Sequence, residues 1–247
     1  MPFGGIICHH THKRVWKADT SHSIQPRYLC SIIQLQRWTP LTAACEAGHT
    51  ACVTALLEAG ADVDRVDGED WTPLQKAAEM GHDSCVCVLL AHGAAVDACD
   101  ANGITALIAA ANGGHVLVVS RLLDAGAGID REDAKGYTAL RRSTLQGNEA
   151  CMRLLLDRGA DVDHASSAGE GWSALMDAAA DGMDTCVKLM LMRGADRSLR
   201  NAKGQTAMML AEEGARAAHS DFGDDGQAER ERCDACAELL RQYSQCM

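Results

Sequence analysis

The residues of this 247-residue chain that could carry out chemistry are first of all thiols and imidazoles. Cys233 and Cys236 form a Cys-x-x-Cys pair, and Cys8 is followed closely by three histidines, ending at His12. Neither group supplies a complete set of zinc ligands at suitable spacing, and redox use of Cys-x-x-Cys requires a βαβ context. We therefore expect no metal and no cofactor, and retain a thiol or metal sensor as one alternative function.

Carboxylates are the second group, because pairs of aspartates recur along the chain. The pairs are Asp62 and Asp64, Asp97 and Asp100, Asp130 and Asp133, and Asp161 and Asp163. The first pair begins a segment that is similar to a calcium loop, but its spacing is wrong and the closing glutamate is missing. Such aspartates usually accept hydrogen bonds from turn backbone, so we interpret them as structural. Their sum makes one edge of the protein acidic, most of all at 62–70, and favours a basic partner.

Catalytic signatures and nucleic-acid signals are both missing. The sequence contains no phosphate-binding loop, no His-Glu-x-x-His and no Gly-x-Ser-x-Gly elbow, so we predict that the protein is not an enzyme. A net charge of −11 argues against binding to nucleic acid or to an anionic membrane, because phosphate repels it. No apolar run reaches the roughly 18 residues that would predict a membrane span. Twelve cysteines without a signal peptide favour the cytoplasm, with the nucleus as the alternative.

Repeated units must position these residues. Six stretches share one register, and they start at Trp38, Trp71, Ile104, Tyr137, Trp172 and Gln205, which are 33, 33, 33, 35 and 33 residues apart. In each unit a Thr or Ser can cap a first short helix, a glycine can end it, and a Leu-Leu-type pair marks a second helix. Helices this short are marginal alone, so their apolar faces must pack against neighbouring units.

The repeated pattern of Thr-Pro-Leu, an Ala-Ala pair, Gly-His, Leu-Leu and Gly-Ala-Asp resembles the ankyrin repeat. The resemblance implies an all-α ankyrin-repeat solenoid of about six helix-turn-helix repeats with finger loops, spanning residues 38–243. The repeats lie near 38–70, 71–103, 104–136, 137–171, 172–204 and 205–243. The sequence departs from the family pattern at Arg141–Arg142–Ser143, where an apolar or His residue and Ala are expected.

Two segments do not follow the pattern. Residues 214–230 are polar and rich in Gly and Asp, and they separate the two helices of the last repeat. We predict that they form a mobile loop insertion. Residues 1–37 carry five basic residues and one acid, and we predict a disordered N-terminal tail in which Tyr28–Leu35 can form a partial cap helix.

Two slots within the repeats carry a recurring residue type. Cys52, Cys85, Cys151 and Cys186 share one slot with Val118, which predicts small buried core residues. Trp38, Trp71, Tyr137 and Trp172 directly precede the capping residue and form what we call the aromatic slot. The ankyrin resemblance implies that this slot lies at the base of a finger beside the concave groove. Trp and Tyr dominate interface energetics, and the alternative is local packing on the adjacent finger.

The resemblance also implies which helix positions face the groove: Glu46, Lys76, Glu79, Met80, Arg142, Gln146, Asp177 and Asp181. Arg141 and Arg142 either reach a carboxylate or phosphate of a partner, or lie in solvent beside nearby acids. The predicted partner-binding residues are Trp38, Trp71, Lys76, Glu79, Met80, Tyr137, Arg141, Arg142, Trp172 and Asp177.

These patterns predict a non-catalytic scaffold or adaptor that binds a partner protein through the concave groove and the finger loops. We expect a monomer whose partner is basic where it contacts the fingers. The alternatives are a regulatory repeat region of a larger enzyme or channel, and the thiol or metal sensor described above.

Overall fold

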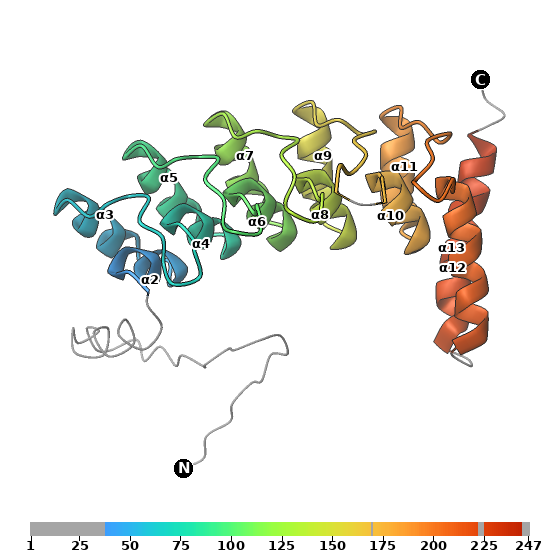
Figure 1. The fold of residues 1–247 in the computed structure, drawn as a ribbon, viewed down its shortest axis with the longest axis horizontal. Helices are drawn as coiled ribbons and strands as arrows, with labels where there is room; N and C mark the ends of the chain where they lie inside the picture. The colour runs from blue at the N-terminus through green and yellow to red at the C-terminus, as the bar shows by residue number, and fades with distance from the viewer. Residues whose placement is uncertain (1–37, 169, 222–224, 244–247) are drawn as a thin grey trace, which may run out of the picture.

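The computed structural model describes residues 38–168, 170–221 and 225–243 (Figure 1). Over these ranges it contains twelve helices and no strand. The first helices of successive repeats lie in one row: α2 (Pro40–Glu46), α4 (Pro73–Glu79), α6 (Ala106–Gly113), α8 (Ala139–Leu145) and α10 (Ala174–Ala180). The second helices lie in a second row: α3 (Thr50–Glu58), α5 (Asp83–Ala91), α7 (Val116–Asp124), α9 (Glu149–Asp157) and α11 (Asp184–Met192). The structure is thus the all-α repeat solenoid that the sequence predicts.

The start and end of each first helix follow from local chemistry. The hydroxyl of Thr72 accepts a hydrogen bond from Gln75 N, and the Gln75 side chain accepts one from Thr72 N, which together make a capping box. The predicted caps of the other four helices in the row, Thr39, Thr105, Thr138 and Ser173, also accept from a backbone N–H. After α4 the chain turns at Gly81, whose φ of 74° suits glycine. The predicted boundaries of the first helices are therefore confirmed.

The core lies between the two rows and is built of Ala, Leu, Val, Cys, Met and Ile side chains. Cys85, Cys151 and Cys186 are buried as predicted. Cys52 is exposed, so its assignment to the core was wrong. In the described part of the chain α3 begins the second row, and no described helix covers its N-terminal side.

Aspartates connect neighbouring finger loops, the segments between each second helix and the next first helix. One aspartate in each of four fingers accepts a hydrogen bond from a backbone N–H of the following finger. These bonds join Asp64 to Ala95 (2.9 Å), Asp97 to Gly128 (3.0 Å), Asp130 to Asp161 (3.1 Å) and Asp163 to Asp196 (2.8 Å). The structural interpretation of these aspartates is confirmed.

The last repeat differs from the prediction. Helix α12 (Ala207–Asp221) continues through the expected loop, and α13 begins at Asp225 and ends at Gln242. Residues 214–221 and 225–230 are therefore helical rather than a mobile loop. Gly214 lets α12 approach α10 closely, because a Cβ there would lie 2.7 Å from the carbonyl oxygen of Ala180. The two helices are 15 and 18 residues long, about 22 and 27 Å, and extend past α10 on the side of the first-helix row (Figure 1).

No helix among the described residues is long and apolar enough to cross a membrane. The predictions for residues 1–37, including the partial cap helix at Tyr28–Leu35 and the Cys8–His12 group, lie outside the described residues.

Candidate functional site

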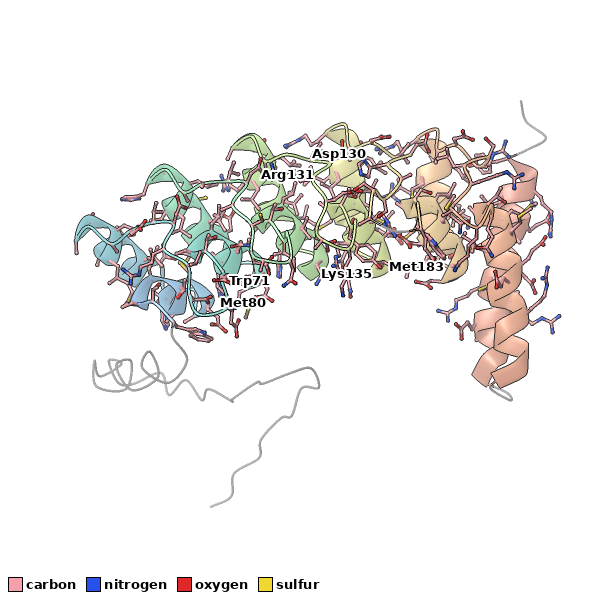
Figure 2. The ribbon with its side chains drawn as sticks, viewed as in Figure 1. Trp71, Met80, Asp130, Arg131, Lys135 and Met183 are labelled. Atoms are coloured by element: carbon pink, nitrogen blue, oxygen red, sulfur yellow. The ribbon has the colours of Figure 1, made fainter. Side chains whose placement is uncertain are left out.

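We call the surface formed by the first-helix row and the adjoining finger loops the first-helix face. All four residues of the aromatic slot lie on it, half-buried, where a finger loop enters a first helix. Trp71 precedes α4 and Met80, which is 45% exposed, follows it, so the two residues flank this helix near the end of the stack that carries α2 and α4 (Figure 2). Exposed apolar side chains and partly exposed aromatic rings on one face are typical of interface residues.

A first cluster surrounds Lys76. Its ammonium lies 4.7 Å from the ring centroid of Trp71 and 5.8 Å from that of Trp38, so it is attracted to the faces of both rings. The same Nζ donates to Glu69 Oε2 at 3.2 Å. The Lys76 side chain is only 9% exposed, whereas that of Glu69 is 62% exposed. Lys76 is thus a buried cation enclosed by two indole rings, with one carboxylate on the solvent side.

Two further carboxylates near Lys76 have an oxygen without a partner. Asp67, 5% exposed, uses Oδ1 to accept from Glu69 N at 2.9 Å and from Trp71 N at 3.0 Å, but its Oδ2 has no partner. Glu46 Oε2 is also buried without a partner. Burial raises the pKa of Glu46, an effect that Lys76 opposes and the neighbouring acids reinforce. We call this group, with Glu79, the Lys76 cluster.

A second cluster lies around Tyr137, and here each cation is paired. Arg141 Nε donates to Asp177 Oδ2 at 2.7 Å and its Nη2 to Asp177 Oδ1 at 3.1 Å, while Nη1 donates to the Gly136 carbonyl at 2.9 Å. Arg142 forms an ion pair with Asp133. Both guanidinium groups lie over the Tyr137 ring, 4.5 and 4.3 Å from its centroid.

The geometry of the second cluster corrects part of the site prediction. Arg141 and Asp177 were expected to contact a partner, but their side chains are 5% and 7% exposed and bind each other. The bidentate pair joins α8 to α10, and burial raises the pKa of Asp177 although Arg141 opposes this. These two residues therefore position neighbouring groups instead of meeting solvent.

Two hollows line the same face, and each is bordered by a tryptophan of the aromatic slot. One of about 730 Å³ lies between the start of α2, the end of α3 and the first finger. Its lining includes Trp38, the charged residues Asp62, Arg65 and Asp67, and several apolar residues. The other, of about 280 Å³, lies between α10 and α12 beside Trp172. The indole Nε1 of Trp172 donates to Glu170 Oε2 at 2.9 Å, which fixes the ring at the rim.

The predicted residues thus fall into three groups by exposure. Glu79 and Met80 are exposed; Trp38, Trp71, Tyr137, Arg142 and Trp172 are half-buried; and Lys76, Arg141 and Asp177 are buried. Sequence reasoning missed the roles of Glu69 and Asp67 beside Lys76. The only signal for them was that the stretch 62–70 is the most acidic of the fingers.

The Cys-x-x-Cys pair lies in α13 and is buried. Burial raises the pKa of Cys233 and raises that of Cys236 to about 12. A thiol this protonated is a poor nucleophile and a poor metal ligand, which weighs against the thiol sensor. Among the residues that the structure describes, no group of three or more His, Cys, Asp or Glu side chains could hold a metal ion.

Family models and a solved structure both match this chain. A model described as ankyrin repeats in three copies matches residues 21–100 and 92–166, and a single-repeat model matches residues 170–202. No match was found among curated proteins. Among solved structures, the ankyrin repeat domain of Bcl-3, described as a unique member of the IκB protein family, is similar to this chain. The TM-score is 0.71 at 24% sequence identity, over 84% of this chain and 87% of that one, and the similarity shows the fold.

Proposed function

Because the chain belongs to the ankyrin repeat family, whose repeats are generally protein-interaction modules, we propose that it is a non-catalytic scaffold or adaptor. It binds a partner protein through the first-helix face and the adjoining finger loops. The protein acts as a monomer in the cytoplasm or nucleus.

One observation carries this proposal: the aromatic slot places four partly exposed aromatic side chains along a single face. Two of them, Trp38 and Trp172, border the two hollows of that face. A partner side chain that enters either hollow buries apolar area against an indole ring that is already held in place. Because the ring is held, it loses little conformational entropy on binding.

The charged residues of the first-helix face have different roles in binding. Arg142 is half-buried above the Tyr137 ring, where it can contact a partner, whereas the Arg141–Asp177 pair supports the ring from within the stack. Glu79 and Met80, exposed at the end of α4 away from Trp71, extend the contact area along the first-helix face. The acidic fingers favour partners with basic surfaces and raise the rate of encounter.

Affinity capture tests the proposal, with the full chain as bait and cell lysate as the source of partners. We expect the double variant Trp71→Ala, Trp172→Ala to lose the captured partner, because buried tryptophans at interfaces contribute about 2 kcal/mol or more each, roughly 30-fold in Kd. Leu117→Ala is the matched control, since Leu117 is apolar and 70% exposed but lies on α7 in the second row. Far-UV circular dichroism verifies that all three proteins keep their helices.

Two results would contradict the proposal. One is undiminished capture by the double tryptophan variant. The other is an equal loss of capture by Leu117→Ala, because that would place the binding surface on the second row of helices.

A further inference from the structure

Two repeats of this chain use the same turn aspartate in different ways. Asp67 and Asp133 each stand nine residues before a cation on a first helix, Lys76 and Arg142. Oδ1 of each aspartate accepts from the backbone N–H groups two and four residues later. The two turns therefore share one geometry, and in the later one Oδ2 reaches the following first helix.

Asp67 and Asp133 differ in the hydrogen-bond partner of Oδ2. In the later repeat, Asp133 Oδ2 accepts from Arg142. In the earlier repeat Lys76 Nζ reaches Glu69 instead, and Asp67 Oδ2 is left buried without a partner. A buried carboxylate oxygen without a donor is costly, so a donor that binds there gains the energy of a charge-assisted hydrogen bond.

The Lys76 cluster also carries more negative charge than the cluster around Tyr137. Around Tyr137, two guanidinium groups face two carboxylates. The Lys76 cluster holds four carboxylates, Glu46, Asp67, Glu69 and Glu79, against one ammonium, a formal excess of three negative charges. Asp62 and Arg65, which line the hollow beside it, add one charge of each sign. Glu46 Oε2 and Asp67 Oδ2 are the two buried side-chain oxygens without a partner in the described part of the chain, and both belong to this cluster.

We propose that the Lys76 cluster is a binding site for an arginine side chain of a basic segment of the partner. The guanidinium stacks on Trp38 and donates to Asp67 Oδ2 from the hollow that both residues line, while the Lys76 ammonium keeps its place over Trp71. Arginine fits better than lysine because its planar group stacks on indole rings and carries five donors. The hollow of about 730 Å³ beside Trp38 and Asp67 gives the side chain room to enter.

This site deepens the protein-binding function proposed above and rests on it. Lys76 repels an incoming cation, but the four carboxylates around it outweigh that repulsion. The N-terminal segment of the chain itself is a second source of basic side chains, because residues 1–37 hold five basic residues against one acid. The experiment below separates the two sources.

The probe is a fluorescein-labelled peptide in which arginine alternates with alanine, titrated into the full-length protein and followed by anisotropy. Matched peptides carry lysine, or citrulline, which has the shape of arginine without its charge. We expect the arginine peptide to bind most tightly and the citrulline peptide about tenfold or more weakly, because hydrogen bonds between charged groups are lost.

Asp67→Asn is the decisive variant, and the chain itself shows that Asn preserves the turn. Asn201 occupies the equivalent position in the last repeat, where its Oδ1 accepts from Lys203 N and Gln205 N. Asp67→Asn should therefore fold normally and weaken the arginine peptide about tenfold or more. Asp100→Asn is the matched control and should change the affinity little, since Asp100 Oδ2 already accepts from Asn102.

Three results of the comparisons above would overturn the inference: equal binding of the citrulline or lysine peptide, unchanged binding by Asp67→Asn, or an equal loss in Asp100→Asn. A full-length variant with Lys13, Arg14, Lys17, Arg27 and Arg37 all changed to Gln tests the internal source. If it binds the peptide about tenfold more tightly than wild type, the chain's own N-terminal segment is the occupant and the inference is wrong. If partner capture depends on Trp71 and Trp172 while no arginine peptide binds, this inference fails and the proposed function stands.

Discussion

Removal of Arg141 from its buried pair tests the physical account of the second cluster most directly. In Arg141→Met the carboxylate of Asp177 stays buried and loses both hydrogen bonds from the guanidinium, and the Gly136 carbonyl loses its donor as well. Breaking a buried ion pair by removal of one partner costs about 3–5 kcal/mol. For a domain of this size that corresponds to a fall in Tm of about 6–20 °C.

The assay is urea unfolding followed by far-UV circular dichroism, with free energies compared only where the urea dependence is unchanged. Arg158→Met is the matched control, because Arg158 Nη1 also pairs across repeats, with Asp124 Oδ1 at 2.8 Å, but both side chains are exposed. We expect the control to cost about 0–1 kcal/mol. The double variant Arg141→Met, Asp177→Leu should recover most of the loss, since no unpaired charge remains buried.

The dependence on pH follows from the sign of the shift. The pKa of Asp177 is raised by burial in the wild type, and loss of Arg141 raises it further. A carboxyl with a folded-state pKa above its unfolded value binds protons more readily when folded, so stability falls as pH rises from the unfolded to the folded pKa. The deficit of Arg141→Met should therefore be largest at neutral pH and shrink toward the ordinary aspartate range. A loss no larger than that of Arg158→Met, or one that does not shrink in acid, would refute the reasoning.

Two further predictions concern packing and thiol access. Gly136→Ala should destabilise the protein by about 1–3 kcal/mol more than Gly204→Ala in the same urea assay. Both glycines have φ of 76°, but only at Gly136 would the new Cβ meet a neighbour, 1.7 Å from Ser166 Oγ. Equal losses in the two variants would show that backbone strain alone matters. Iodoacetamide followed by mass spectrometry should label exposed Cys52 and Cys99 in the native protein, and should label the buried thiols only after denaturation: Cys45, Cys85, Cys151, Cys186, Cys233 and Cys236. Burial raises the pKa of Cys151 to about 11, so native labelling of that residue at a rate near that of Cys52 would contradict the packing.

Much of the fold could be predicted because its determinants are local. The capping hydroxyl of Thr72 and its partner Gln75 are three residues apart, and the turn at Gly81 depends on the conformation of one residue. Repetition of these signals five times in register made the helix order and the register of the stack readable from the sequence. The aromatic slot could be located for the same reason, since it directly precedes each cap.

The candidate site could be predicted only in part. The sequence identified Lys76, Arg141 and Asp177 as residues of interest, but not which of them would meet solvent. Arg141 and Asp177 are 36 residues apart, and whether they meet depends on how α8 packs on α10. Lys76 pairs with Glu69 while its counterpart Arg142 pairs with Asp133, and the position equivalent to Glu69 in that repeat is Lys135. The sequence shows this difference, but not that Asp67 Oδ2 would be left without a donor.

The sequence by itself therefore determined the repeat architecture, the boundaries of the first helices in the first five repeats and the position of the aromatic slot, because these depend on contacts within a few residues. The tertiary structure decided which charges are neutralised inside the stack and which carboxylate oxygens remain without a donor. It also decided the course of the last repeat, where α12 continues to Asp221 and Gly214 lies against Ala180 of α10. These outcomes depend on distances between neighbouring repeats, and such distances arise only when the repeats pack.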